Sequence, residues 1–180
     1  MSDELQEMQE SAEAAHHRPD LAPVSVTMAI LAVLVAAVSL LGHRSHTEEL
    51  LNQSKASDAW AEYQAKSIRR HNFELFGDLV SMIGAKDAVQ SGKIGEKYAQ
   101  QAARYREDQD KIMEQAHEFE AEVGVAGRRG NRFDLGEVIL EASLVIVSMA
   151  LITKKRSFWI FGMIVGVGGL AVTATGFLLH

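Results

Sequence analysis

Two stretches of this 180-residue chain contain no Asp, Glu, Lys or Arg: residues 21–43 and residues 157–180. Each exceeds the roughly 20 apolar residues that an α-helix needs to cross about 30 Å of hydrocarbon. A third apolar stretch, residues 135–153, is interrupted only by Glu137 and Glu141. A soluble domain of this size has little use for three such stretches, so the sequence predicts an integral membrane protein.

Most of the charge lies between the first and second apolar stretches. Residues 44–134 hold 14 of the 18 Lys and Arg residues and 16 of the 24 Asp and Glu residues. This region is expected to lie in water, and it lacks the basic excess of a nucleic-acid-binding domain. The chain has no cysteine, which excludes disulfides, thiolate metal sites and cysteine nucleophiles. Its two prolines, Pro19 and Pro23, precede or open the first apolar stretch, so the rest is free to be helical.

The first apolar stretch could be mistaken for a secretory signal. A signal core has about 7–15 apolar residues after a basic segment. This stretch is longer, and it follows a polar tail over residues 1–20 that holds six acidic residues and Arg18 as its one basic residue. We therefore expect an uncleaved transmembrane helix at residues 21–43. The adjacent His16 and His17 of the tail are interpreted as solvated side chains.

Residues 44–134 are expected to form a helical hairpin, paired as an antiparallel coiled coil, between the first and second spans. In the first arm, apolar residues recur at every seventh position, with two others beside them: Ala61, Ile68, Leu75, Met82 and Val89, flanked by Ala65 and Leu79. The second arm carries a heptad seam with spacings of four and three: Tyr98, Ala102, Tyr105, Gln109, Ile112, Ala116, Phe119 and Val123. In one interpretation this seam pairs the two arms, and in the other it also recruits further copies or a partner.

Glycines mark both ends of the second arm. Residues 90–95 include Gly92 and Gly95 and are predicted to form the turn between the arms. Each arm is then about 40 residues long, or about 60 Å of helix, so the chain returns to the membrane face that it left. Three further glycines predict a hinge before the second span: Gly124, Gly127 and Gly130.

The second and third transmembrane helices are placed at residues 135–153 and 157–179, joined by a tight basic turn at residues 154–156. Small residues line one face of the first span: Ser25, Ala29, Ala32, Ala36 and Ser39. They also line one face of the third: Gly162, Gly166, Gly169, Thr173 and Gly176. Close approach through small residues is a main source of helix association in lipid. We expect these faces to pack against the same chain or another copy, and we expect a homo-oligomer. Trp159 is placed in the interfacial aromatic belt.

Two pairs of polar residues lie where the hairpin meets the spans. His43 and His46 are three positions apart, and Glu137 and Glu141 are four apart. Together they are candidate ligands for a divalent cation or a proton, and ordinary ion pairing with nearby arginines is the alternative interpretation. Glu141 is the stronger candidate because it lies about one turn deeper in its span. No nucleotide-binding loop, nucleophile elbow or zinc-protease motif is present, so we expect no catalytic residue, no cofactor and no enzymatic activity.

Four segments carry a resemblance to a known family. They read Gly-His-Arg-Ser-His-Thr-Glu at residues 42–48, Trp60 with Tyr-Gln-Ala-Lys-Ser-Ile-Arg at residues 63–69, Phe-Asp-Leu-Gly-Glu at residues 133–137, and Leu-Ile-Thr-Lys-Lys-Arg at residues 151–156. From Val24 to the C-terminus the chain resembles the bacterial membrane-protein family called domain of unknown function 4337. The resemblance implies a three-span bacterial membrane protein with a long helical insert, and it implies no activity, ligand or catalytic residue.

The sequence therefore favours a non-enzymatic, all-α membrane protein whose hairpin acts as an oligomeric scaffold or as an accessory subunit. Its expected partners are the lipid bilayer, other copies of itself and a larger membrane complex, with no nucleic acid. The alternative function is a small homo-oligomeric ion channel or transporter that uses Glu141, Glu137, His43 and His46.

Orientation in the bacterial inner membrane is set by Lys and Arg residues near the ends of the spans. The side of the tail has four such cations, namely Arg18 and the three of the basic turn, and the hairpin side has about five: Arg44, Lys55, Arg128, Arg129 and Arg132. We give more weight to the turn, because three consecutive cations in so short a loop resist export. The tail and the turn are thus predicted in the cytoplasm, and the hairpin is predicted in the periplasm.

Overall fold

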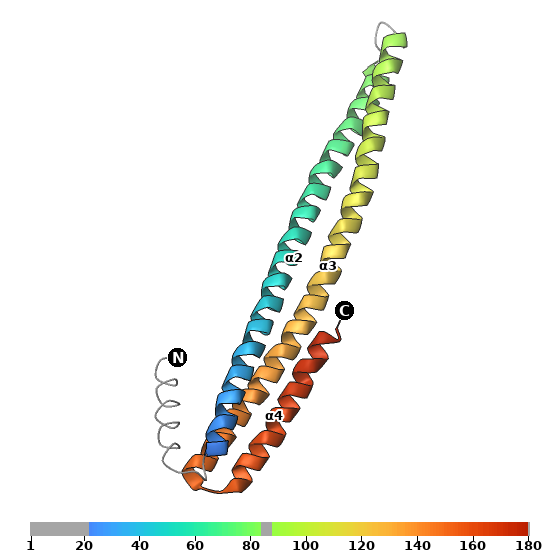
Figure 1. Cartoon of the computed structure of the whole chain (residues 1–180). Helices are drawn as coiled ribbons and strands as arrows, with labels where there is room; N and C mark the ends of the chain where they lie inside the picture. Colours follow the sequence, from blue (N-terminus) through green and yellow to red (C-terminus); the bar gives the residue numbers. More distant parts are fainter. Residues whose placement is uncertain (1–21, 84–87, 180) are drawn as a thin grey trace. The chain divides into compact units, whose positions relative to one another are not determined.

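The computed structural model describes residues 22–83 and 88–179, which form three α-helices and no strand within those ranges. Helix α2 comprises Ala22–Ile83, helix α3 comprises Ala88–Thr153 and helix α4 comprises Arg156–Phe177 (Figure 1). The predicted all-α fold is confirmed. The expected polar tail, with His16 and His17, lies outside the described residues.

The connection between α3 and α4 is as short as the sequence predicts. Lys154 has a φ of +55°, a left-handed conformation that a non-glycine residue adopts as a single residue and not as a helix. Lys155 is extended, with φ −101° and ψ 118°, and its carbonyl oxygen accepts a hydrogen bond from the Phe158 N–H at 3.3 Å. The third basic residue, Arg156, already belongs to α4.

Two predicted interruptions of the helices are absent. Helix α2 ends at Ile83 and α3 begins at Ala88, so residues 90–95 belong to α3. The predicted position of the turn is therefore wrong. Helix α3 also continues without a hinge through the three glycines at residues 124–130. A glycine inside a helix lowers helix stability by about 1 kcal/mol relative to alanine. This cost does not interrupt α3, a continuous helix of 66 residues.

The chain divides into two units. Unit 1 comprises Met1–Thr47 and Val125–His180, and unit 2 comprises Glu48–Gly124. These boundaries lie inside the polar region expected at residues 44–134, because both ends of that region make their contacts within unit 1. Helices α2 and α3 each contribute residues to both units.

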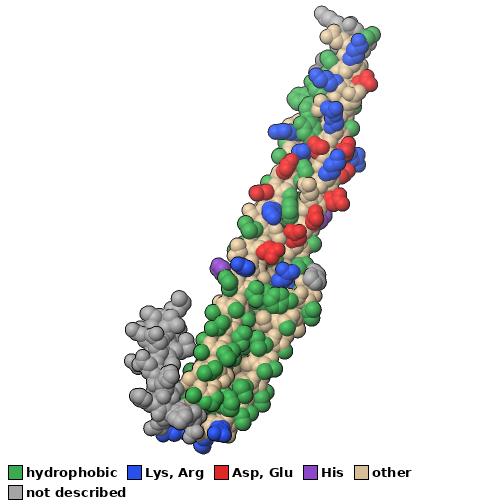
Figure 2. All heavy atoms as spheres, in the orientation of Figure 1, with side chains coloured by type: hydrophobic (Ala, Val, Ile, Leu, Met, Phe, Trp, Pro, Cys, Tyr) green, Lys and Arg blue, Asp and Glu red, His purple; other side chains and the backbone are tan. Residues whose placement is uncertain are grey.

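Unit 1 holds an apolar core made by all three helices. Half-buried residues of α4 pack against buried residues of α2 and α3. The buried residues are Val24, Met28, Leu31, Val38, Phe133, Leu140, Val147 and Ala150. Many other large apolar side chains of unit 1 face outward, among them Val33 and Ile164, which are 69% and 65% exposed. On the face seen in Figure 2, hydrophobic side chains dominate this unit, whereas charged side chains are spread over unit 2.

Unit 2 is an antiparallel pair of helical segments. An early residue of the α2 segment contacts a late residue of the α3 segment, as Trp60 does with Glu120. A later residue of α2 contacts an earlier residue of α3, as Phe73 does with Tyr98. The structure buries four residues of the predicted α3 seam and leaves the others half-buried. The four buried residues are Ala102, Gln109, Ile112 and Ala116.

The seven-residue pattern predicted for the first arm does not face α3. Its large members Ile68, Leu75, Leu79 and Met82 are 63%, 60%, 47% and 81% exposed. A different face of α2 contacts α3, through buried or half-buried residues that include Asn52, Ala56, Tyr63, Phe73 and Gly77. The first-arm prediction is therefore wrong, because the α3 tyrosines pack on Phe73, with ring centroids 5.9 Å away for Tyr98 and 5.7 Å away for Tyr105.

Candidate functional site

The small residues of α4 form its contact with α3. All five are buried: Gly162, Gly166, Gly169, Thr173 and Gly176. A Cβ added to Gly162 would lie 2.5 Å from Cγ2 of Val147 and 3.2 Å from the backbone oxygen of Ser143. A Cβ added to Gly169 would lie 3.2 Å from the backbone oxygen of Gly136. The neighbour of this stripe is thus α3 of the same chain, at a separation that suits glycine.

Hydrogen bonds accompany this packing. The buried Ser143 hydroxyl donates to the carbonyl oxygen of Gly162 at 2.7 Å. Trp159 lies half-buried on α4, and its Nε1 donates to Oγ1 of Thr27 on α2 at 3.1 Å. Trp159, which the sequence places in an aromatic belt, therefore also joins α4 to α2.

The small residues of the first span contribute less to packing within the chain. Ala29 and Ala36 are exposed, while three others are half-buried: Ser25, Ala32 and Ser39. The α2 residues in the core of unit 1 are larger and lie on a neighbouring face. Contact of this small-residue face with another chain stays a prediction.

A polar pair joins α2 and α3 within unit 1. Nε2 of His46 and Oδ2 of Asp134 are 2.9 Å apart, with the two side chains 40% and 50% exposed. Each side chain lies over a glycine of the opposite helix. A Cβ added to Gly130 would lie 2.9 Å from Cε1 of His46, and one added to Gly42 would lie 2.8 Å from Oδ1 of Asp134. Two glycines thus make room for one hydrogen-bonded pair.

The four candidate ion ligands do not assemble into one site. His43 and Glu141 are exposed, Glu137 is half-buried, and His46 contacts Asp134. Across the described residues, no group of three or more His, Cys, Asp and Glu side chains lies close enough to hold a metal ion. The sequence analysis did not predict Asp134 as a partner of His46. A signal was present, because a glycine stands four residues before each of them, Gly42 before His46 and Gly130 before Asp134.

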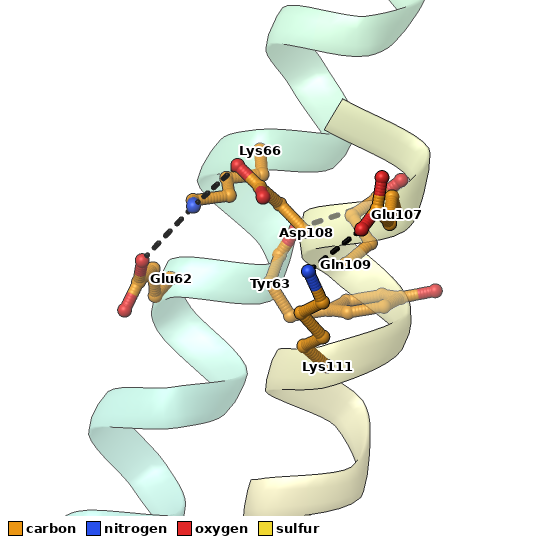
Figure 3. A network of polar contacts seen from close by, with 7 residues as sticks. All are labelled: Glu62, Tyr63, Lys66, Glu107, Asp108, Gln109 and Lys111. Atoms are coloured by element: carbon orange, nitrogen blue, oxygen red, sulfur yellow. Dashed lines mark hydrogen bonds and ion pairs between the residues drawn. The ribbon is translucent and has the colours of Figure 1, made fainter. Parts of the chain in front are cut away.

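Unit 2 carries a network of polar contacts around the middle of its helix pair (Figure 3). Lys66 Nζ lies between Oδ2 of Asp108 at 3.0 Å and Oε1 of Glu62 at 3.4 Å. The hydrogen bond that Lys66 donates to the Asp108 carboxylate is the main reason that the pKa of Lys66 is raised. Gln109, which is 1% exposed, donates from Nε2 to the backbone oxygen of Tyr63 at 3.4 Å. Its Oε1 has no hydrogen-bond partner within the described residues.

A second polar contact in unit 2 centres on Glu120. The indole Nε1 of Trp60 donates to Oε1 of Glu120 at 2.8 Å, and Nδ1 of His117 lies 3.0 Å from Oε2. The bond from Trp60, followed by that from His117, lowers the pKa of the Glu120 carboxyl. The rings of Trp60 and His117 also meet edge to face, with centroids 5.3 Å apart.

These contacts link α2 to α3 or join neighbours along one helix. Lys66 and Glu120 each have one partner on the opposite helix and one on their own helix. What unit 2 presents to its surroundings is charged side chains and the exposed apolar face of α2. The candidate functional site is therefore a surface.

Comparison with known proteins gives one match. No curated protein and no solved structure matches this chain. The family described as a domain of unknown function, DUF4337, matches residues 20–179, which include all the described residues of the three helices. That match covers nearly the whole chain and agrees with the resemblance carried by the segments around His46 and Asp134. The chain belongs to the DUF4337 family.

Proposed function

We propose that this chain is a non-enzymatic, three-span membrane protein whose helical hairpin projects from the bilayer and assembles other membrane proteins around it, as a scaffold or accessory subunit. The observation that carries the proposal is the contrast in surface between the two units. Unit 1 exposes large apolar side chains, whereas unit 2 exposes many charged ones. An apolar exterior suits lipid, and a charged helix pair suits water.

The lengths of the helices support this arrangement. Within the described residues, α2, α3 and α4 are each long enough to cross a membrane, and each contains a stretch that is apolar enough to do so. The first two continue into unit 2, so a bilayer around unit 1 leaves residues 48–124 outside it. In the proposed orientation, in a bacterial inner membrane, unit 2 lies in the periplasm and the Lys154-Lys155 turn in the cytoplasm.

The orientation can be tested with reporter fusions. Alkaline phosphatase inserted at Gly92, where an added Cβ meets no atom within 4 Å, is expected to be active in the periplasm. The same enzyme fused after Lys154 is expected to be inactive. Fluorescence of a green fluorescent protein inserted at Gly92 would reverse the orientation and place the partners of unit 2 in the cytoplasm.

The scaffold role can be tested by cross-linking in native membranes. Lys93, Lys97 and Lys111 on α3 are exposed in unit 2, and the proposal expects their cross-links to reach the same membrane protein in repeated experiments. A tag on that protein should recover this chain in return. A chain that migrates alone after gentle extraction, with no cross-link from unit 2, would contradict the scaffold role.

One observation favours the alternative function of an ion channel or transporter. Glu141 is exposed although it lies within the apolar part of α3, where a carboxylate facing lipid costs roughly 2.5–3.5 kcal/mol. A channel predicts cation flux into liposomes that contain the purified chain, and loss of that flux in Glu141→Gln. Glu122→Gln, an exposed position of unit 2, is the matched control.

A further inference from the structure

The apolar residues on the outer face of α2 in unit 2 form a continuous stripe. We define the α2 stripe by seven exposed residues that follow one another at spacings of four and three: Ala61, Ala65, Ile68, Asn72, Leu75, Leu79 and Met82. The four large apolar members are between 47% and 81% exposed. Monomeric soluble surfaces seldom leave such a contiguous apolar patch uncovered.

The α2 stripe faces away from α3. Two residues of α2 that contact α3 are Lys66, two positions before Ile68, and Phe73, five positions after it. At 3.6 residues per turn, two positions correspond to about 200° around the helix. Around Ile68 the stripe and the α3 contact therefore lie on nearly opposite sides of α2, and all seven residues of the stripe are exposed.

The corresponding outer face of α3 is different. Within its unit 2 segment the most exposed large apolar residues after the first turns are Ile94 and Met113, at 38% and 37%, and they do not share a heptad register with each other. Charged residues occupy most of the exposed positions of this segment. The apolar stripe is thus a property of α2 alone.

We infer that the α2 stripe is the surface on which a second copy of this chain docks, as a parallel two-stranded coiled coil of α2 against α2. Spacings of four and three are the pattern by which one helix packs along another in a coiled coil. The inference rests on the proposed function, because copies that span one membrane in one orientation present their α2 helices in parallel.

Asn72 identifies the occupant as a second copy in the same direction. In the heptad of the stripe, Ile68 and Leu75 take d positions, and Asn72 takes an a position between them. In a parallel pair each a position meets its own equivalent, so Asn72 meets Asn72 and both amides are hydrogen-bonded, which is a known determinant of two-stranded pairing. In an antiparallel pair an a position faces a d position, so Asn72 would face an apolar residue such as Leu75 and lose that bond.

The residues that flank the stripe are compatible with the same pairing. In a parallel coiled coil a g residue faces the e residue five positions later on the other helix. This rule brings Gln64 to Arg69 and Ser57 to Glu62, an amide beside a guanidinium and a hydroxyl beside a carboxylate. No two like charges face each other across the stripe, so a second copy meets no electrostatic penalty.

The absence of cysteine from the sequence allows a direct test. Leu75→Cys and Leu79→Cys each introduce the only thiol of the full-length chain, and oxidation in native membranes should join most copies of each variant into covalent dimers. Ala103→Cys, on an exposed position of α3, is the control and should give at least tenfold less dimer. Equal yields at all three positions, or no dimer at the α2 positions, would overturn the inference.

A mixture of Ile68→Cys and Leu79→Cys chains distinguishes the two directions. Parallel pairing predicts dimers of like chains, whereas dimers that form only between unlike chains show an antiparallel pair and overturn the inference. Leu75→Glu added to Leu79→Cys should reduce the dimer yield about tenfold and leave helix content unchanged by circular dichroism. If these dimers are absent while unit 2 still cross-links reproducibly to another membrane protein, the docking inference fails and the proposed function stands.

Discussion

In unit 1 the stripe of small residues on α4 lies against α3, whereas in unit 2 the stripe of apolar residues on α2 faces away from α3. Gly166 is buried, and an added Cβ there would lie 2.8 Å from Oγ of Ser143. Leu75 is 60% exposed. Both stripes have the same spacing of four and three, so periodicity alone does not reveal which neighbour a helix face will meet.

The surroundings proposed for the two units, lipid for unit 1 and water for unit 2, account for the difference. In lipid, burying an apolar helix face against another helix adds little stability, because the lipid is also apolar. The helices therefore pack through the face whose small residues let the two backbones approach closely. In water, apolar burial and ring contacts both contribute, and Phe73 with the α3 tyrosines takes the contact between the segments. The α2 stripe is then left for a different neighbour.

The largest effect is expected from filling the glycine stripe. Gly166→Leu would place a side chain against Ser143 and Leu31, the latter 3.1 Å from an added Cβ. Overpacking of this kind costs about 1–3 kcal/mol and more where backbones are in contact, so the detergent-solubilised chain should lose its thermal transition or melt many degrees lower. Gly168→Leu, where an added Cβ meets no atom within 4 Å, is the control. Equal melting of the two variants would show that the α4 contact contributes nothing to stability.

The next effect separates the inner and outer faces of unit 2. Ile112→Asp puts a charge at a position that is 6% exposed, which should destabilise the helix pair by roughly 3 kcal/mol. Ile68→Asp, at a position 63% exposed, should leave the melting of the dilute chain nearly unchanged and lower only its association. The measurements are circular dichroism melting and analytical ultracentrifugation. A larger loss of helix stability in Ile68→Asp would reverse the assignment of the two faces.

A smaller effect is expected at Gln109, which is buried with Oε1 unpartnered among the described residues. Gln109→Leu removes the orphaned acceptor together with one long hydrogen bond, so stability should stay level or rise by about 1 kcal/mol. Chemical denaturation in a Trp159→Phe background, in which Trp60 is the one remaining tryptophan, measures the change by fluorescence. A clear loss of stability would mean that the bond to Tyr63 outweighs the unpaired oxygen.

The smallest effect concerns pH. Because the pKa of Glu120 is lowered in the folded chain, its contribution to stability is complete above the ordinary pKa of a glutamate and disappears as the pH falls through the lowered value. The melting temperature of the native chain should therefore decline slightly more on acidification than that of Glu120→Gln. Glu118→Gln, an exposed neighbour, should behave like the native chain. Parallel pH profiles for all three would remove Glu120 from the stabilising contacts.

The sequence was sufficient for the all-α fold, for the three apolar stretches, and for the buried faces of α4 and of α3 in unit 2. It predicted Gly162 to Gly176 because small residues share one side of α4, and it predicted Ala102 to Ala116 because the residues of the α3 seam recur at spacings of four and three. The α2 face in unit 2 could not be predicted, because its contact with α3 includes Asn52, Tyr63 and Gly77, which carry no apolar periodicity. The predicted position of the turn was wrong because glycine also occurs inside helices, as Gly92 does in α3.

The pairing of His46 with Asp134 across two glycines has a mechanical consequence. Each bulky side chain fits where the opposite helix has no side chain, at Gly130 and at Gly42. If α2 slid along α3 by one turn, about 5.4 Å, His46 would meet a residue that has a Cβ, such as Ala126, and the 2.9 Å contact with Asp134 would break. A slide of α2 by one turn along α3 would therefore cost a steric clash at His46 and the contact with Asp134, which favours a single register between the two helices within unit 1.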